Sequence, residues 1–332
     1  MSLVSDVLEH NNVKILGLLA LVIGYVLDAN NQSEYFYMAL VLAVVVILVT
    51  LVQILYVKKV YDHETIWIPL VIKIESNESG QTVLQGLFKE IEKNSDFTNL
   101  EKNLKRYSNI VAQDLVFEYS GELFDKERLI SFMQIIKYQI TQIRQNFPNR
   151  VQFHLAFYNK PAVGFLVGTL FDKEDVVIYQ QNPDEDLFDR VAHLTKRNYK
   201  TEVLEYKNFS IREKFDDKES STVLLSIKAS SHQIALNADS LEKYKNRVIM
   251  HAKHNGTIDL KEDWILYERE IFTQLNKLQT EYKKIVIAHA MPESIAVMVG
   301  MAVGTYWNIS MTQYKDGEYL ELICLDEVKC YF

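Results

Sequence analysis

The sequence predicts an α/β protein that follows an N-terminal two-helix transmembrane hairpin, and three observations lead to this fold class. Two apolar runs lie near the N-terminus, at about residues 13–28 and 35–57. After them, apolar strand patterns alternate with helical patterns, which is typical of α/β domains. A strand, a proline turn and a helix of small residues occur twice, within residues 151–180 and 284–314. This repeat is too long for a solenoid and predicts two fused Rossmann-like units.

The second apolar run, residues 35–57, is the strongest single signal in the chain, with Thr50 and Gln53 as its clearly polar side chains. At about 1.5 Å per residue it crosses a hydrocarbon core of roughly 30 Å, and aromatic residues lie at both of its ends. The first run, residues 15–27, is shorter than the usual minimum of about 17 residues, so a buried core helix or a signal-peptide core are alternatives. Its acidic leader and the full span that follows favour the first arm of a hairpin.

Basic residues predict the orientation of this hairpin. Lys14, Lys58 and Lys59 flank its outer ends, whereas the connecting loop has acidic residues and no basic one. Because Lys and Arg are retained on the cytoplasmic side, both termini are expected in the cytoplasm. The chain is therefore divided into a hairpin at residues 1–59, a linker with the first part of the cytosolic α/β region at 60–150, and a domain core at 151–332.

Composition limits the classes of function. The 332 residues are 48% apolar, as in folded proteins, and 44 acidic residues outnumber 36 basic ones. An acidic chain is a poor binder of nucleic-acid polymers, which are held largely by phosphate neutralisation, whereas a small anion in a local pocket is compatible with it. The two cysteines, Cys324 and Cys330, lack the paired spacing of zinc sites or disulfide frameworks, so they are expected to be packing residues in a reducing compartment.

The expected elements of the cytosolic part run in a regular order. We expect a strand within 63–76, helices near 81–93 and 97–106, a strand within 109–121, a helix at 125–146, a strand at 151–157, a helix to Phe171 and a strand at 176–180. An acidic turn, an amphipathic strand region near 201–213 and an apolar strand within 221–231 follow. The second copy comprises a helix at 264–282, a strand at 283–289, a turn at 291–294, a helix to Met301 and a strand near 307–314.

Five stretches, in this order, resemble the SAVED domain: HLAFYNKPAVGFLVG, VVIYQ, LLSIKAS, WILYEREIFTQL and IVIAHAMPESIAVMVG. That family consists of two fused CARF-type Rossmann-like units that sense cyclic oligonucleotides in the bacterial anti-phage signalling known as CBASS. The resemblance covers roughly Ile68 to Phe332 and is strongest from Val151 onward. With the hairpin in front, the whole chain resembles a membrane-type SAVED effector.

The resemblance implies partners and a location. The ligand would be a cyclic di- or trinucleotide made by a CD-NTase-type synthase, with no cofactor, no metal and no nucleic-acid polymer. The chain would form a homo-oligomer on ligand binding and contact membrane lipids. It would be a multi-pass protein of the bacterial inner membrane that senses the ligand and permeabilises the membrane, or forms a pore, to cause abortive infection.

Candidate ligand contacts follow from the two proline turns, because ligands of open parallel sheets bind beyond the carboxyl ends of strands, where helix N-termini present unpaired N–H groups. Val163 helps to open the first helix, and Gly164 and Ala296 are small enough to let a ligand approach the backbone, with packing as the alternative. Trp307 is a further aromatic candidate for base stacking. The candidate contacts are Tyr158, Lys160, Pro161, Ala162, Tyr179, Ser230, Ser231, Met291, Pro292, Glu293, Ser294 and Tyr314.

The two copies do not align without a shift of one residue. When Pro161 is aligned with Pro292, the closing glycines Gly168 and Gly300 fall out of register, and alignment on the glycines displaces the prolines. The second copy also has Ala288 or His289 where the first has an aromatic residue. Contacts within 288–293 are therefore predicted to within one position.

No catalytic set is found, so the chain is not expected to be an enzyme. His154 lies in a strand pattern and is interpreted as a core residue, and His251 and His254 are assigned to a surface turn without metal partners. No phosphate-binding glycine loop or nucleophile elbow accompanies the acidic loops. The alternative hypothesis is a membrane-tethered nuclease or cyclic-nucleotide phosphodiesterase on the same fold.

Overall fold

The computed structural model describes residues 24, 65–75, 78–94, 100–105, 109–147, 151–182, 187–195, 198–254 and 256–331. Apart from Gly24, the predicted membrane spans lie outside these ranges. Within the described ranges, no helix has both the length and the apolar character that a membrane crossing requires. The chain divides into two compact units, one of residues 1–65 with 105–109 and one of residues 66–104 with 110–332, and the sheets belong to the second unit.

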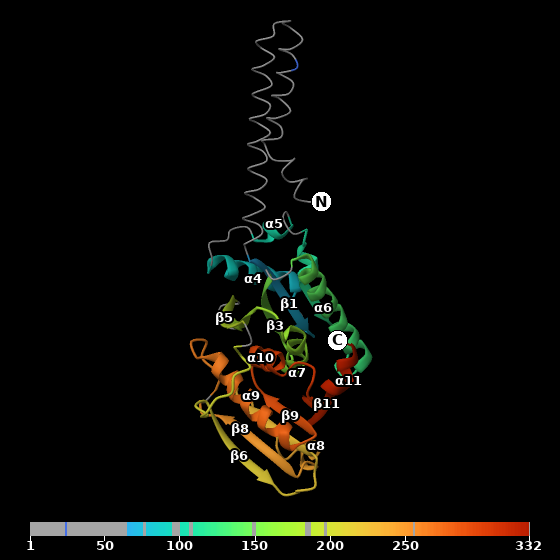
Figure 1. Cartoon of the computed structure of the whole chain (residues 1–332), viewed down its shortest axis with the longest axis vertical. Coiled ribbons are helices and arrows are strands. Elements are labelled where there is room, and N and C mark those ends of the chain that lie inside the picture. Colours follow the sequence, from blue (N-terminus) through green and yellow to red (C-terminus); the bar gives the residue numbers. More distant parts are fainter. Residues whose placement is uncertain are drawn as a thin grey trace. The chain divides into compact units, whose positions relative to one another are not determined.

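The first half of this unit is built on a five-stranded sheet (Figure 1). Its order is β2-β1-β3-β4-β5, and all neighbours are parallel except β4 and β5. The strands are β1 (Ile66–Ile74), β2 (Val116–Tyr119), β3 (Val151–Tyr158), β4 (Val176–Asn182) and β5 (Leu187–Leu194). The helices are α4 (Gly80–Lys93), α5 (Leu100–Asn103), α6 (Lys126–Asn146) and α7 (Pro161–Gly168), with 3-10 turns at Ala112–Leu115 and Thr169–Phe171.

The second half is built on a six-stranded sheet of order β11-β10-β9-β7-β8-β6. Its strands are β6 (Phe209–Phe215), β7 (Thr222–Lys228), β8 (Asn246–Ala252), β9 (Lys284–Ala290), β10 (Ile309–Lys315) and β11 (Glu318–Cys324). Its helices are α8 (Asp239–Glu242), α9 (Trp264–Glu281), α10 (Glu293–Val303) and α11 (Leu325–Val328), with a 3-10 turn at Lys329–Tyr331. The strands β7, β8, β9 and β10 are parallel, and β6 and β11 are antiparallel edges.

The two halves share one topology. Strands β1 to β5 correspond in chain order, in sheet order and in direction to β7 to β11, and β6 is an addition beyond β8. The helix before the central strand begins in both halves at an aspartate, because Asp125 accepts the backbone N–H of Arg128 and Asp263 accepts that of Leu266. The predicted mixed α/β class is confirmed, and the duplication that the sequence predicts from residue 151 onward begins earlier, at β1.

Helices α7 and α10 pack against each other between the two sheets (Figure 1). Gly168 and Gly300 are each the eighth residue of their helix, and Phe165 and Val297 are each the fifth. A Cβ atom on Gly168 would lie 2.1 Å from the carbonyl oxygen of Val297, and one on Gly300 would lie 2.0 Å from that of Phe165. This reciprocal contact fixes the register of the repeat on the glycines, so Pro161 corresponds to Glu293.

Two predicted strand regions are shorter than expected. Within 109–121, only Val116–Tyr119 is a strand, because Ala112–Leu115 forms a 3-10 turn. Within 201–213, the strand starts at Phe209. The carboxylate of Glu270 accepts the backbone N–H groups of Lys207, Asn208 and Phe209, which satisfies these donors without a strand partner.

Strands β5, β8 and β11 were not expected from the sequence. Strand β8 contains His251, which the sequence assigns to a surface turn, and that assignment is wrong although the side chain is exposed. Edge strands β5 (LFDRVAHL) and β11 (EYLELIC) contain charged residues that interrupt their apolar pattern. Cys324 at the end of β11 is buried as expected, whereas Cys330 is exposed and is not a packing residue.

Candidate ligand-binding site

The strand order reverses at equivalent places in the two sheets, between β1 and β3 and between β7 and β9. Ligands of open α/β sheets bind beyond the carboxyl ends of strands at such points. In the first half Lys73 is paired with Tyr158 at these ends, and in the second half Lys228 is paired with Ala290. Lys73 and Lys228 are therefore equivalent, and the loops that follow them form the candidate site.

The carboxyl ends of the two sheets meet at the α7–α10 pair. The hydroxyl of Ser294 donates to the carbonyl oxygen of Tyr179 at 3.2 Å, and its backbone N–H donates to Oε1 of Gln180 at 3.4 Å. The amino end of α10 thus lies at the carboxyl end of β4, which belongs to the other half. Helix α7 in turn packs on β10. Segments that are more than 100 residues apart in the sequence therefore meet at this helix pair.

Glu293 begins α10 within this region. Burial raises the pKa of its carboxyl, while its own backbone N–H, the side chain of Gln180 and the neighbouring His232 act in the opposite direction. His232 lies in the loop after β7 and Gln180 on β4, so both halves contribute to the surroundings of this acid. A carboxyl that holds its proton more tightly than usual is less repulsive toward an anion than an ordinary surface carboxylate.

The loop after β3 in the first half has an unusual backbone. Asn159 and Lys160 both have positive φ angles, 67° and 59°, and so does Glu75 after β1, at 47°. The Asn159 side chain holds the two loops together, because Nδ2 donates to the carbonyl oxygen of Ile74 at 2.9 Å and Oδ1 accepts the backbone N–H of Lys160. The Nζ of Lys160 lies 3.2 Å from the carboxylate of Glu75. The predicted contact Lys160 is thus at the site but already paired.

A second carboxylate occupies the start of α4. Oε1 of Glu118 accepts the backbone N–H of Gly80 at 2.7 Å and lies 3.3 Å from Nζ of the buried Lys73. Lys73 also donates to the carbonyl oxygen of Glu78. A Cβ atom on Gly80 would lie 2.3 Å from this carboxylate and 2.4 Å from the side chain of Val116, so a larger residue here would displace these side chains. The protein's own carboxylate therefore takes the position after the first strand at which Rossmann folds bind phosphate.

The second half lacks both carboxylates. Lys228 Nζ donates to Oε1 of Gln233 at 2.9 Å, and its neighbour on β8 is His251 in the place of Glu118. Among the described residues, no carboxylate lies within ion-pair distance of Lys228. Ser230 corresponds to Glu75, and its Oγ accepts the backbone N–H of His232 at 3.3 Å. Lys228 thus presents a cation to the site beside the predicted contacts Ser230 and Ser231.

Other predicted contacts differ in their accessibility. Pro161, Pro292 and Tyr158 are partly buried at the strand ends, and Ser231 is exposed. Four predicted residues are buried and reach the site with their backbone at most: Ala162, Tyr179, Met291 and Ser294. The Tyr179 hydroxyl lies 2.9 Å from Nδ1 of His154, whose Nε2 lies 3.1 Å from Oε1 of Gln152, which confirms His154 as a satisfied core residue. Burial lowers the pKa of His154 to about 3.

Gly164 and Ala296 are buried, which favours the packing alternative over ligand approach at their backbone. A Cβ atom on Gly164 would lie 3.2 Å from the ring of Phe157 and 3.3 Å from the side chain of Val297. Tyr314 is 52% exposed on β10 and lies beside Tyr319, with ring centroids 5.1 Å apart. Tyr314 is therefore the predicted aromatic residue that retains the most ring surface for stacking.

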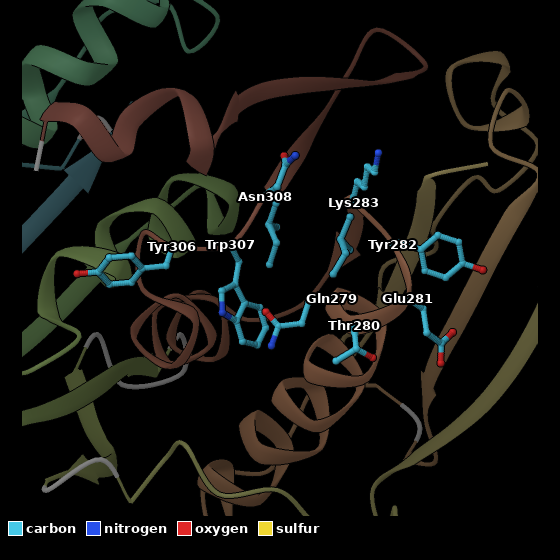
Figure 2. A pocket seen from close by; sticks show the side chains of 10 residues that line it. Gln279, Thr280, Glu281, Tyr282, Lys283, Tyr306, Trp307 and Asn308 are labelled. Carbon is cyan, nitrogen blue, oxygen red and sulfur yellow. The ribbon is translucent and has the colours of Figure 1, made fainter. Parts of the chain in front are cut away.

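Trp307 is at the wrong end of the sheet for the predicted ligand. It precedes β10 and stacks on Phe272 with ring centroids 5.7 Å apart. It lines a pocket of about 410 Å³ formed by residues 279–283, Ile285 and residues 306–309 (Figure 2). This pocket lies at the carboxyl end of α9 and the amino ends of β9 and β10, opposite to the edge that carries Lys228.

Sequence reasoning missed Glu75, Asn159 and Lys228 as members of the site. Lys228 ends the apolar strand within LLSIKAS, and a lysine at the end of a buried strand indicates a candidate anion contact. The role of Glu75 was not detectable, because its partner is 85 residues away and only the β1–β3 pairing brings the two together.

His289 corresponds to Phe157 beneath the two helices and distinguishes the halves. Both ring nitrogens are buried and have no hydrogen-bond partner among the described residues. Burial lowers the pKa of His289 to about 4, with the backbone of Thr312 acting in the opposite direction. The neutral imidazole therefore lies under the candidate site where the first half has a phenyl ring.

No protein-family model and no curated protein matches this chain. Among solved structures, it is similar to the Acinetobacter baumannii Cap4 SAVED/CARF-domain containing receptor with the cyclic trinucleotide 2'3'3'-cAAA, at 16% identity and a TM-score of 0.49, over 78% of this chain and 52% of that one. The Moraxella osloensis Cap4 SAVED/CARF-domain containing receptor gives 11% identity and a TM-score of 0.43, over 79% and 50%. The chain thus spans about half the length of these receptors.

Proposed function

We propose that this chain is a membrane effector of bacterial anti-phage defence whose cytosolic part is a SAVED domain that binds a cyclic oligonucleotide. The observation that carries the proposal is the meeting of two equivalent carboxyl edges at the α7–α10 pair, with Lys160 in one half and Lys228 in the other. A cyclic oligonucleotide has phosphates and bases around a ring. Two facing edges contact different parts of such a ring at once, and lysines bind its phosphates.

The two edges are unequal, which suits an unequal ligand. The first half offers Lys160 beside Glu75, and the second half offers Lys228 beside Ser230. Tyr314 supplies an exposed ring on which a base gains about 1–3 kcal/mol by stacking. A ring whose bases or linkages differ would bind in one orientation.

The membrane step rests on the sequence of residues 1–59. The first arm of the predicted hairpin is shorter than a bilayer, and such a mismatch is relieved by thinning the bilayer or by association of helices. Ligand-driven assembly of the cytosolic domains would gather several hairpins and breach the inner membrane. The damage then lies in the hairpin and the recognition in the domain.

The decisive experiment incubates the full chain in detergent with cyclic di- and trinucleotides, including 2'3'3'-cAAA and 3'3'3'-cAAA. Binding is followed by isothermal titration and particle size by light scattering in the same samples. One ligand that binds and enlarges the particle supports the proposal, provided that its linear counterpart does neither. Absence of binding across the panel, with a folded protein, would reject it.

A further inference from the structure

The ion pair between Lys160 and Glu75 differs from the neighbouring pair between Lys73 and Glu118. Glu118 also accepts the Gly80 N–H, and Lys73 is 5% exposed and also donates to a carbonyl oxygen, so that pair is fixed in the fold. In contrast, the side chains of Lys160 and Glu75 are 28% and 34% exposed. Among the described residues, neither side chain has a second hydrogen-bond or ion-pair partner. The Lys160 pair is therefore exchangeable.

The backbone holds this exchangeable pair in place. Glu75 and Lys160 are on neighbouring loops with positive φ angles, and Asn159 bonds the Lys160 loop to the end of β1. Positive φ angles at residues other than glycine are costly and persist where the surroundings enforce them. The pair is thus presented at the strand ends by two constrained loops. The second half has Ser230 and Pro292 at the equivalent positions, so it has no such pair.

We propose that Glu75 is an internal counter-ion that occupies the anion subsite of Lys160 in the free protein and that a phosphate group of the ligand displaces it. This inference rests on the proposed function, because it concerns the regulation of the same ligand-binding site. A carboxylate and a phosphate compete for the same ammonium group, and the displaced carboxylate returns to water because it is one-third exposed. An anion of low charge does not displace Glu75 from Lys160. Glu75 therefore sets the minimum anion charge that the first half binds, whereas Lys228 has no competing carboxylate among the described residues.

The test uses inorganic pyrophosphate as the anion and the full chain in detergent, with isothermal titration at fixed ionic strength. Glu75→Gln keeps the side-chain size and removes the competing charge, so we expect pyrophosphate to bind about two- to fivefold more tightly than to the wild type. Lys160→Met should weaken binding. In the double variant the gain from Glu75→Gln should disappear, because the ammonium group for which the two anions compete is absent.

Glu118→Gln is the matched control. It removes a glutamate on the same edge, but we expect a lower thermal midpoint and no tighter binding, because that carboxylate accepts the Gly80 N–H. Unchanged affinity of Glu75→Gln, a gain that survives Lys160→Met, or no pyrophosphate binding by any variant would each overturn the proposal. If pyrophosphate binds in the expected pattern but no cyclic nucleotide binds, the counter-ion role of Glu75 is supported and the proposed function is rejected.

Discussion

Gly168 and Gly300 face each other across the two halves, because a Cβ atom on Gly300 would lie 3.2 Å from the Cα of Gly168. Each glycine also lies against a backbone carbonyl oxygen of the opposite helix. The contact is between main chains, so side-chain rearrangement does not relieve a substitution there. This close approach places the amino end of α10 at the end of β4 and thereby assembles the candidate site from two halves.

Replacement of either glycine by alanine should force α7 and α10 apart. We expect Gly168→Ala and Gly300→Ala each to lower the free energy of unfolding by about 3 kcal/mol, at the upper end of overpacking costs, as measured by thermal denaturation of the full chain. Gly86→Ala on α4 is the control, because its nearest neighbour would be the Phe188 ring at 3.8 Å. It should be neutral or stabilising by about 1 kcal/mol. Equal effects at the three positions would contradict the close packing.

His289→Phe should remove a pH dependence of stability. The pKa of His289 is lowered to about 4 in the folded protein, from 6.5, so its contribution is complete above pH 6.5 and is lost as the pH falls toward 4. The loss amounts to about 3 kcal/mol. The variant should match the wild type at pH 8, since Phe157 occupies the equivalent position, and be more stable than it at pH 5. Denaturant melts at both pH values measure this, and a parallel decline of both proteins would refute it.

Glu268 should lower the stability of the wild type as the pH rises, the reverse of the effect of His289, and Glu268→Gln should remove this loss. Glu268 on α9 is 0% exposed with both oxygens unpartnered among the described residues, and burial raises its pKa well above the usual value, against the effects of Arg269 and Lys200. An acid with a raised pKa costs stability as the pH rises above about 4.3, where the unfolded chain ionises. The glutamine variant should equal the wild type at pH 4 and exceed it by on the order of 2 kcal/mol at pH 8. A wild type whose stability does not fall in this range would exclude the effect.

Ser294→Ala should loosen the contact between the halves and thereby weaken ligand binding. The variant loses the hydroxyl bond to the Tyr179 carbonyl oxygen, and a hydrogen bond of this kind contributes about 0.5–1.5 kcal/mol. Ser294→Arg would be a poorer test, since the side chain is 2% exposed and an arginine would disrupt the packing itself. Thermal melts and titration of the ligand found in the panel measure both effects. Ser231→Ala, at an exposed position in the loop after β7, is the control for stability and should melt like the wild type.

Deletion of residues 1–59 should separate recognition from membrane damage. The truncated protein should bind the ligand with wild-type affinity but fail to release dye from vesicles of bacterial phospholipids, because the proposed damaging step lies in the predicted hairpin. The full chain reconstituted in the same vesicles is the positive control. Ligand-dependent growth arrest by the truncated protein would point to an enzymatic activity in residues 60–332 instead.

The sequence by itself determined the α/β class, the central strands β3 and β9 and the long helices α6 and α9. These elements follow from local causes: buried parallel strands are continuous apolar runs, and the aspartates at 125 and 263 cap the two helices. It also placed Lys160 and Ser230 in loops at the ends of the strands. These features could be predicted because they depend on residues within one short segment.

Only the tertiary structure decided the register of the two copies and the pairing within the site. Main-chain contact between α7 and α10 aligns the two copies on their glycines. Alignment on the two prolines gives a register that is wrong by one residue. The Lys160–Glu75 pair depends on the alignment of β1 with β3, and the bond from Ser294 to Tyr179 spans the two halves. Such contacts join residues far apart in the chain, and their partners are selected by sheet order and helix packing, which no short stretch of sequence encodes.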